Sequence, residues 1–270
     1  MTETIIITGA SDGIGAAAAH ALSDSGHAVV LVGRSPEKTA KVAASLGADH
    51  FVADFAKLSE VRRLAAELRE RYPRIDVLAN NAGGIYGDRT ITEDGHELTV
   101  QVNHLAPFLL TTLLMDRLVL SRARVINTSS VANLSGSIDI DDLDLANKFS
   151  PGRAYSNAKL DNILFTRELD RRFGAEGITT AAFHPGVVAS NFASESTSPL
   201  RVIYRSLLRH TLISSEKGAD TLVWLATTTP GHDWTSGEYY IKRKPGRTNT
   251  QADDARLASA LWERSAALVE

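Results

Sequence analysis

The sequence predicts an α/β protein with a single-domain Rossmann fold, in which helices cover both faces of a doubly wound, seven-stranded parallel sheet. Two observations lead to this prediction. Short β-branched runs alternate with helical patterns along the chain, which is typical of a parallel sheet wound by helices. A glycine-rich turn also joins the first strand to a helix at Thr8–Gly15, as in dinucleotide-binding folds. Because no repeat or linker interrupts the 270 residues, we expect one domain over residues 1–270.

The strands are expected where short apolar runs lie between turn residues. The runs that meet this description are Thr4–Thr8, Ala28–Val32, His50–Ala53, Val77–Ala79, Arg124–Asn127, Thr179–Phe183 and Gly237–Ile241. Helices are expected between them. Ser35 and Pro36 mark the start of one helix, with serine at the N-cap and proline in the first turn. Two stretches do not follow the alternation, namely residues 132–152 and residues 187–215.

Composition and charge exclude several classes of protein. Basic and acidic residues number 29 and 32, and the resulting net charge of −3 gives no sign of a nucleic-acid partner. The chain has no cysteine, which rules out disulfides and thiolate catalysis, and its eight histidines show no zinc-binding spacing, so no metal site is expected. No apolar run reaches the roughly 18 residues of a membrane span, and no cleavable leader precedes the first strand. We therefore expect a soluble, cytoplasmic protein.

The turn after the first strand reads Thr8-Gly9-Ala10-Ser11-Asp12-Gly13-Ile14-Gly15. Glycine permits a tight turn and a close approach of the backbone to a ligand. The start of the following helix offers unpaired N–H groups and a partial positive charge to a pyrophosphate. The spacing G-x-x-x-G-x-G differs from the more common fingerprint G-x-G-x-x-G. A dinucleotide site is the favoured interpretation, and a purely structural turn is the alternative.

The end of the second strand predicts which dinucleotide binds. At this position an acidic residue binds the ribose 2′-hydroxyl of NAD(H), whereas an arginine accommodates the 2′-phosphate of NADP(H). Here the strand ends in Gly33 and Arg34, followed by Ser35 and, three residues later, Lys38. Since positions 33 and 34 carry no acid, the sequence favours NADP(H) over NAD(H). The alternative is that Arg34 is an ordinary surface arginine.

Tyr155 and Lys159 form the clearest candidate for proton transfer. They stand four positions apart in a helical stretch, so their side chains share one helix face. A free tyrosine has a pKa of about 10. A neighbouring ammonium favours the phenolate and lowers that pKa toward the working pH. The pair can therefore act as a general acid during reduction of a carbonyl and as a general base during oxidation of an alcohol.

Together these features resemble the short-chain dehydrogenase/reductase family over nearly the whole chain, and most of all its branch of retinol dehydrogenases and their bacterial relatives. The motifs that carry the resemblance follow the family's order: Thr8–Gly15, Asp54, Asn80-Asn81-Ala82-Gly83, Asn103, Ser130, Tyr155, Lys159 and His184-Pro185-Gly186-Val187-Val188. The resemblance implies an NADP(H)-dependent oxidoreductase that interconverts an alcohol and a carbonyl by hydride transfer, with Tyr155 as general acid or base.

The resemblance also assigns residues to roles. The implied catalytic residues are Asn103, Ser130, Tyr155 and Lys159. The implied cofactor-binding residues are Gly9, Ser11, Asp12, Gly13, Ile14, Gly15, Arg34, Ser35, Asp54, Phe55, Asn81, Ala82, Gly83, Tyr155, Lys159, Pro185, Gly186, Val188 and Ser190. Ser130 would hold the substrate oxygen, with Ser129 as the alternative. Asn103 would support a proton relay through lysine and water rather than serve as a local packing residue. Asp54 would meet the adenine rather than act only as a turn residue.

Two segments and one position distinguish this chain. Twenty-five positions separate Ser130 from Tyr155, so residues 132–152 form an insert before the catalytic helix. Residues 190–214 stand where the family has its substrate-covering segment. Their apolar residues at helical spacing predict a lid over a lipophilic substrate, with an ordinary surface helix or one on a membrane surface as alternatives. These apolar residues are Leu200, Ile203, Tyr204, Leu207 and Leu208. Many NADP-preferring relatives carry a basic residue at the position of Asp12, so the predicted phosphate site depends on Arg34, Ser35 and Lys38.

Two other functions stay open on the sequence alone. One is reduction of a C=C bond by an enzyme of the same fold, and the other is a non-catalytic regulator that binds NADP(H). A regulator of this kind loses the tyrosine or the lysine, whereas both Tyr155 and Lys159 are present here. The expected partner is a small-molecule substrate, without nucleic acid, and a homo-oligomer is compatible with the sequence.

Overall fold

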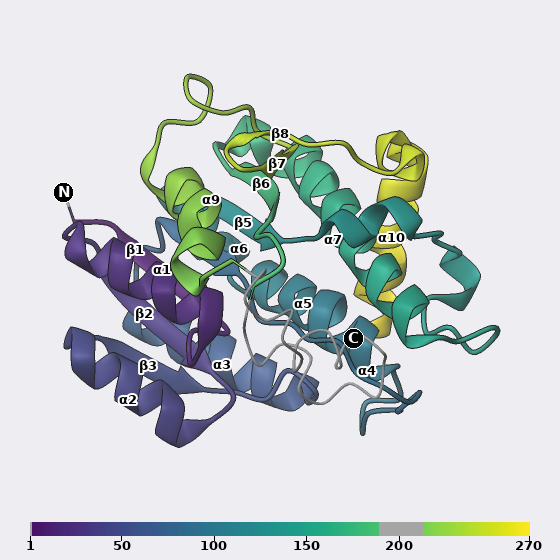
Figure 1. Cartoon of the computed structure of the whole chain (residues 1–270), viewed down its shortest axis with the longest axis horizontal. Coiled ribbons are helices and arrows are strands. Elements are labelled where there is room, and N and C mark those ends of the chain that lie inside the picture. The colour runs from purple at the N-terminus through teal and green to yellow at the C-terminus, as the bar shows by residue number, and fades with distance from the viewer. Residues whose placement is uncertain (1, 189–212) are drawn as a thin grey trace.

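Within the described part of the chain, residues 2–188 and 213–270 of a computed structural model, eight strands form one sheet (Figure 1). Their order across the sheet is β3-β2-β1-β4-β5-β6-β7-β8. The strands are β1 (Thr4–Thr8), β2 (Ala28–Gly33), β3 (Asp49–Val52), β4 (Val77–Asn80), β5 (Arg124–Thr128), β6 (Thr179–His184), β7 (Glu238–Ile241) and β8 (Lys244–Pro245). β1 to β7 are parallel, which confirms the predicted Rossmann fold. Ser190 and the apolar residues of the predicted lid lie outside the described residues.

The eighth strand corrects the predicted count of seven. β8 pairs antiparallel with β7, where Tyr240 lies opposite Pro245 and Ile241 opposite Lys244. The chain reverses through Lys242 and Arg243, whose φ angles are 51° and 61°. Two left-handed residues form the tight hairpin turn that matches the twist of paired strands, and Asn-Gly is the usual signal for it. A Lys-Arg pair carries no such signal, so the short strand was missed.

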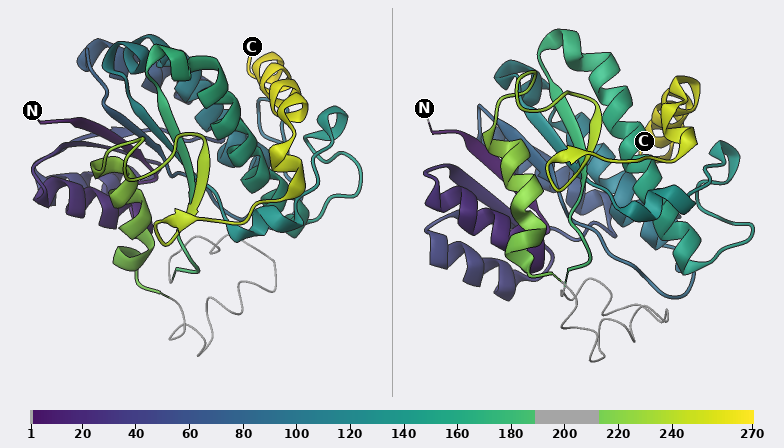
Figure 2. Two further views of the ribbon diagram at one scale, coloured as in Figure 1. Left: turned by 90° about the horizontal axis from the view of Figure 1, so that it is seen from above. Right: turned by 45° about the horizontal axis from the view of Figure 1, so that its top comes forward.

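Helices cover the two faces of the sheet (Figures 1 and 2). The helices are α1 (Gly13–Asp24), α2 (Pro36–Leu46), α3 (Leu58–Arg71), α4 (Leu98–Val100), α5 (Ala106–Leu113), α6 (Met115–Ser121), α7 (Pro151–Phe173), α9 (Ser215–Thr227) and α10 (Ala255–Leu268). One core joins the sheet to α1 and α9, and another joins it to α3, α5 and α7. A third cluster packs α10 onto the outer side of α7, so α10 forms an additional layer there.

Continuous apolar runs in the central strands produce this layered arrangement. Ile5, Ile6 and Ile7 of β1 are all fully buried. Ile6 pairs with Val30 of β2 and Leu78 of β4 and belongs to the core beneath α3 and α5. Ile5 and Ile7 belong to the core on the opposite face, with α1 and α9. A strand that is buried on both faces has no polar alternation, because both of its sides need apolar residues.

The strand order places a crevice at the carboxyl ends of the central strands. The chain proceeds from β1 outward to β2 and β3, then crosses back to β4 on the other side of β1. The connections after β1 and β4 therefore leave in opposite directions. Open α/β sheets bind their ligands in the crevice that forms at this reversal.

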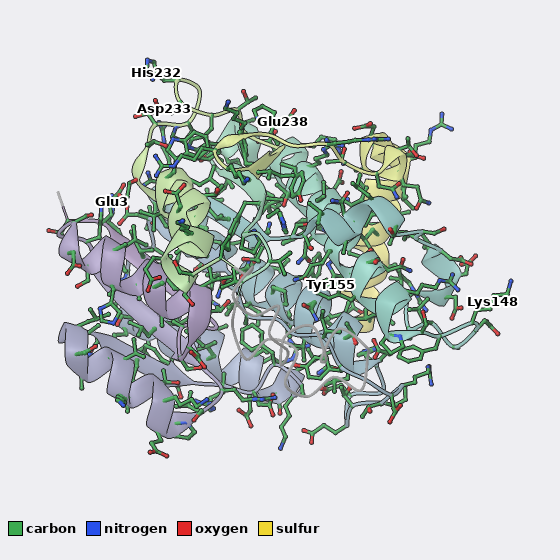
Figure 3. All side chains as sticks on the ribbon, viewed as in Figure 1. Glu3, Lys148, Tyr155, His232, Asp233 and Glu238 are labelled. Atoms are coloured by element: carbon green, nitrogen blue, oxygen red, sulfur yellow. The ribbon has the colours of Figure 1, made fainter. Side chains whose placement is uncertain are left out.

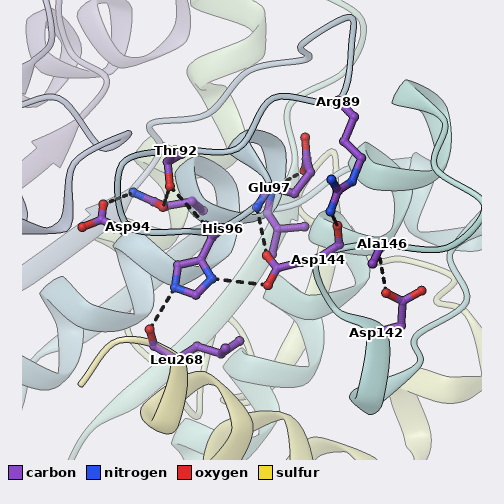
Figure 4. A network of polar contacts seen from close by, with 11 residues as sticks. Arg89, Thr92, Asp94, His96, Glu97, Asp142, Asp144, Ala146 and Leu268 are labelled. Atoms are coloured by element: carbon purple, nitrogen blue, oxygen red, sulfur yellow. Dashed lines mark hydrogen bonds and ion pairs between the residues drawn. The ribbon is translucent and has the colours of Figure 1, made fainter.

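A polar network attaches the insert at residues 132–152 to the rest of the fold (Figure 4). His96 lies 3.3 Å from a carboxylate oxygen of Asp144 and 2.9 Å from the carbonyl oxygen of Leu268. Arg89 donates to the carbonyl oxygens of Asp144 and Leu145. Asp144 lies beside His96, and this contact raises the pKa of the imidazole. The network thus joins the insert to the segment after β4 and to the end of α10.

No single helix of the described residues is long and apolar enough to cross a membrane. One pair, Leu98–Leu113 with Met115–Ser121, has sufficient length and apolar composition only when its two parts are taken together, and it bends by 65° between them.

The buried carboxyl of Asp161 should affect how the stability of the protein depends on pH. This residue of α7 is fully buried, and among the described residues its Oδ1 atom has no hydrogen-bond partner. Burial raises the pKa of the Asp161 carboxyl well above its ordinary value. The folded state therefore holds a proton that the unfolded state releases above about pH 4, and the stability of the protein falls as the pH rises from there. Asp161→Asn should raise the free energy of unfolding at pH 7, and this gain should shrink toward pH 4.

Urea unfolding of both proteins between about pH 4 and pH 8 measures this difference. Asp88→Asn, which changes an exposed carboxyl, is the control and should show little dependence on pH. A gain from Asp161→Asn that is the same at every pH would contradict the prediction.

Candidate active site

A cavity of about 550 Å³ opens at the carboxyl ends of the strands and contains most of the predicted site residues. Predicted residues that line it are Gly9, Ser11, Asp12, Gly13, Ile14, Gly15, Arg34, Asp54, Phe55, Asn81, Ala82, Gly83, Ser130, Tyr155, Lys159, Pro185, Gly186 and Val188. Ser35 and Asn103 are not among the lining residues, and Ser190 lies outside the described part of the chain. The Ser35 side chain instead caps α2 by accepting a hydrogen bond from the backbone N–H of Lys38.

Close backbone contacts shape the glycine turn at one end of the cavity. Gly9 has a φ of 67°, and a Cβ atom at this position would stand 2.8 Å from the Cα atom of Ala82. A Cβ atom on Gly15 would stand 2.3 Å from the carbonyl oxygen of Gly9. The Thr8 hydroxyl accepts hydrogen bonds from the backbone N–H groups of Asn81 and Ala82, each at 3.0 Å. These contacts join the turn after β1 to the residues that follow β4, and the start of α1 lines the cavity.

The edge of the cavity beside β2 carries both signs of charge. Arg34 is exposed and lines the cavity, whereas Gly33 lies against α2, since a Cβ atom there would stand 2.3 Å from the Thr39 hydroxyl. Lys38 lies 3.8 Å from the carboxylate of Asp12. Asp12 also caps α1 by accepting from the backbone N–H of Gly13 at 2.7 Å. This edge therefore presents the guanidinium of Arg34 next to an ion pair.

Asp54 lies after β3, where it lines the cavity and holds its own turn. One of its carboxylate oxygens, Oδ1, accepts from the backbone N–H of Ala56 at 3.0 Å. The backbone N–H of Asp54 donates to Glu60 at 2.8 Å. These contacts orient the carboxylate of Asp54 and leave its Oδ2 atom outside the turn.

Helix α7 carries Tyr155, which is labelled in Figure 3, and Lys159, and both line the cavity. The helix starts with Ser150 at the N-cap, which accepts from the backbone N–H of Arg153, and Pro151 follows in the first turn. The Lys159 Nζ atom lies 5.5 Å from the centroid of the Tyr155 ring and donates to the carbonyl oxygen of Thr128 at 3.1 Å. Burial lowers the pKa of Lys159 to about 7. The predicted proton-transfer pair is thus brought together at the end of β5.

The two serines after β5 have different tasks. Ser129 is buried, and its hydroxyl donates to the carbonyl oxygen of Lys159 at 2.6 Å. Ser130 also lines the cavity, and its hydroxyl oxygen accepts from the backbone N–H of Ala132 at 3.2 Å. That contact leaves the hydroxyl proton of Ser130 for another acceptor. This arrangement favours Ser130 over Ser129 as the residue that meets a substrate oxygen.

Asn103 lies behind the cavity wall, in the π-helical turn η1 (Gln101–Leu105). Its side-chain amide donates to the carbonyl oxygens of Thr99 and Gly84 and accepts from the backbone N–H of Gly84. In an α-helix the carbonyl of Asn103 would accept from residue 107, but Pro107 has no N–H. The sequence therefore disfavours a regular helix at this point.

The side chains of Asn103 and Lys159 both lie close to Gly83. A Cβ atom on Gly83 would stand 2.5 Å from the Asn103 Oδ1 atom and 3.3 Å from the Lys159 Nζ atom. The Asn103 and Lys159 side chains therefore approach the same position beside Gly83, although Asn103 does not line the cavity. Any larger residue at position 83 would push both side chains away.

Several lining residues were not predicted. Among them are Tyr86, Val102, Val131, His184 and Val187. Burial lowers the pKa of His184 to about 4, so its imidazole is neutral at pH 7. Its position directly before Pro185-Gly186, at the end of β6, was the available signal, and the sequence analysis did not assign it to the site. Val131 and Val187 are exposed apolar residues, which periodicity alone does not assign to a cavity.

The arrangement fits a bound dinucleotide. The glycine turn, which any Cβ atom would fill, and the start of α1 can hold a pyrophosphate. Arg34 and Asp54 stand where the adenosine end would lie, and Ser130, Tyr155 and Lys159 stand where the reacting end would lie. The residues present therefore match a nicotinamide cofactor that extends from the glycine turn to the catalytic pair.

Comparisons with known proteins agree with this geometry. A sequence profile of the short chain dehydrogenase family matches residues 3–200. A candidate daunorubicin C-13 ketoreductase, DnrU, from Streptomyces sp. (strain C5) is 46% identical over 99% of this chain and 92% of its own length. Human retinol dehydrogenase 13 is 37% identical over 99% of this chain and 84% of its own length.

Solved structures show the same fold. An uncharacterised protein from Mycobacterium paratuberculosis has a TM-score of 0.79 and 32% identity, covering 99% of this chain and 93% of that chain. RhlG of Pseudomonas aeruginosa, described as an NADP active-site complex, has a TM-score of 0.68 and 26% identity, covering 88% of this chain and 93% of that chain. Given this coverage and identity, the chain belongs to the short-chain dehydrogenase family of nicotinamide-dependent oxidoreductases and is similar to its retinol dehydrogenases.

Proposed function

We propose that the protein is an NADP(H)-dependent oxidoreductase that interconverts an alcohol and an aldehyde or ketone. The observation that carries the proposal is the placement of Tyr155 and Lys159. Both lie on one face of α7, at the far end of a cavity that starts at the glycine turn. A dinucleotide held by that turn would bring its reacting end to the tyrosine hydroxyl.

Each catalytic residue then has one task. The nicotinamide, when bound, supplies or accepts the hydride. Ser130 donates a hydrogen bond to the substrate oxygen, and Tyr155 gives a proton to the same oxygen during reduction or removes it during oxidation. Lys159 binds the nicotinamide ribose and, in its ammonium form, lowers the pKa of the Tyr155 hydroxyl. Asn103 supports proton delivery toward Lys159, since both side chains approach the same position beside Gly83.

NADP(H) is the proposed cofactor rather than NAD(H). Arg34 at the end of β2 is the main support, because its guanidinium can form charge-assisted hydrogen bonds to a 2′-phosphate. The structure of RhlG, described as an NADP complex, is a relative with this cofactor. The carboxylate of Asp12 disfavours NADP(H), because it would repel a 2′-phosphate. Its contacts with the backbone N–H of Gly13 and with Lys38 reduce this repulsion.

The proposed substrate is lipophilic. Val131 and Val187 line the cavity with exposed apolar side chains. An apolar substrate would cover this apolar surface, whereas a polar substrate would not remove it from contact with polar groups. The similar proteins are named for daunorubicin and for retinol. The single domain over residues 1–270, the lid at residues 190–214, the cytoplasmic location and a homo-oligomer stay predictions. The C=C reductase and the non-catalytic regulator gain no support from the described site.

The first test of function removes the proposed proton donor. Tyr155→Phe keeps the ring and should lower kcat for carbonyl reduction by about 100- to 10,000-fold, as expected for loss of a general acid. NADPH should still bind, which quenching of protein fluorescence by the cofactor measures. Tyr72→Phe removes a hydrogen-bonded hydroxyl far from the cavity and is the matched control. Near-normal turnover by Tyr155→Phe on a panel of aldehydes, ketones and quinones would refute the proposal.

The second test concerns cofactor choice. Arg34→Ala should weaken NADPH binding by about 10- to 100-fold and leave NADH binding nearly unchanged, since a charged hydrogen bond contributes about 1.5–3 kcal/mol. Isothermal titration of both cofactors measures this change in preference. Arg256→Ala removes an exposed arginine of α10 that does not line the cavity and should change neither constant. Equal affinities of the unmutated protein for NADPH and NADH would overturn the assignment.

A further inference from the structure

The segment that follows β5 carries Ser130 but has little regular structure of its own. We call residues 130–138 the serine loop. Its only regular part is the short 3-10 helix η2 (Val131–Ser135). A backbone outside helices and sheets still needs partners for its N–H and carbonyl groups, and the side chains of neighbouring segments are the usual source. The partners of the serine loop therefore decide how firmly Ser130 is held.

Asn249, in the connection between β8 and α10, supplies several of these partners. Its side-chain Nδ2 atom lies 2.8 Å from the carbonyl oxygen of Gly136 and 3.3 Å from those of Asn133 and Leu134. Its backbone N–H donates to the Asn133 Oδ1 atom at 2.9 Å. One residue thus contacts the serine loop through four hydrogen bonds, across more than a hundred positions of sequence.

Asn133 transmits this contact to Ser130. Its side chain is fully buried, and its Nδ2 atom donates to the carbonyl oxygen of Ser130 at 2.7 Å. An amide side chain has one accepting end and one donating end. Since the accepting end is held by the N–H of Asn249, the donating end must face Ser130. The backbone N–H of Asn249 therefore orients the Asn133 side chain, while the Asn249 side chain holds the Asn133 backbone. The two contacts together fix the backbone of Ser130.

Two further amide side chains anchor the distal end of the serine loop. Gln251 accepts from the backbone N–H of Ile138 at 2.8 Å and donates to its carbonyl oxygen at 3.2 Å. Asn157, on α7, makes the same pair of contacts with Ser137 at 2.9 and 3.0 Å. The loop is thus held between the chain that leads to α10 and the catalytic helix. Figure 2 shows this connection running from the sheet edge toward α10, beside α7.

We propose that Asn249 is a positioning residue for the reaction, whose side chain holds the Ser130 hydroxyl at the substrate oxygen by fixing the backbone of the serine loop at Asn133, Leu134 and Gly136. The proposal depends on the proposed role of Ser130 in catalysis. Asn249 lies after residue 200, where the match to the family profile ends, so the proposed determinant of catalysis lies outside the matched residues. A side chain that only stabilises the fold would leave the rate per folded molecule unchanged, whereas a positioning residue changes that rate.

The first experiment compares three variants of the full chain. Asn249→Ala removes all side-chain contacts, and Asn249→Asp keeps the Oδ1 atom that accepts from the N–H of Gln251 but removes the donor to the loop carbonyls. Asp254→Ala, the matched control, removes a capping side chain of α10 in the same segment, without contact to the serine loop. Both Asn249 variants should lower kcat by about 10- to 100-fold, with the NADPH dissociation constant unchanged. Asp254→Ala should keep its kcat while losing thermal stability.

A double-mutant cycle tests whether the effect passes through Ser130. In the Ser130→Ala background the hydroxyl is gone, so Asn249→Ala should lower kcat by less than about twofold more. Losses that multiply in the double variant would overturn the proposal, and so would an unchanged kcat in Asn249→Ala.

Hydrogen exchange separates failure of this proposal from failure of the proposed function, because it needs no substrate. In Asn249→Ala the amides of Asn133, Gly136 and Ile138 should exchange at least about tenfold faster than in the unmutated protein, and in Asp254→Ala they should not. If the unmutated protein reduces no carbonyl, the proposed function fails, and exchange still shows whether Asn249 holds the loop. Unchanged exchange in Asn249→Ala would refute the positioning role whatever the activity.

Discussion

The active site depends on the burial of one ammonium group. Lys159 is almost entirely inaccessible to solvent, and its Nζ atom donates to the carbonyl oxygen of Thr128 beside the ring of Tyr155. Removing an ammonium from water is costly unless nearby groups favour its charge, so burial alone lowers the pKa of Lys159 to about 7. A phenolate at Tyr155 would favour that charge, and the ammonium would in turn favour the phenolate.

The local geometry around Lys159 explains several unusual features of the backbone. A side chain at Gly83 would collide with Asn103 and crowd Lys159, because both approach the position that its Cβ atom would take. Asn103 reaches this position from a π-helical turn, where Pro107 cannot supply an α-helical hydrogen bond. The hydroxyl of Ser129 is taken up by the carbonyl of Lys159, which leaves Ser130 to face the cavity.

The sequence predicted those parts of the fold and of the candidate site that follow a regular apolar pattern or a recognisable motif. The apolar runs predicted the seven parallel strands, and the order of glycine, asparagine, tyrosine and lysine motifs predicted most of the cavity lining. Contacts between distant segments carry no such local signal. The hairpin at Lys242-Arg243 lacks glycine, His184 was not assigned to the site, and Asn249 meets the serine loop across 116 positions of sequence. Such contacts depend on the tertiary path of the chain, which residue patterns alone do not specify.

The short strand β8 also protects the edge of the sheet against pairing with another copy of the protein. Without it, β7 would present an open row of backbone N–H and carbonyl groups, which is a template for edge-to-edge aggregation. β8 occupies that row over only two residues, and these are a lysine and a proline. A charged side chain and a residue without an N–H make poor continuations of a sheet. The hairpin thus ends the sheet in a form that another chain cannot easily extend.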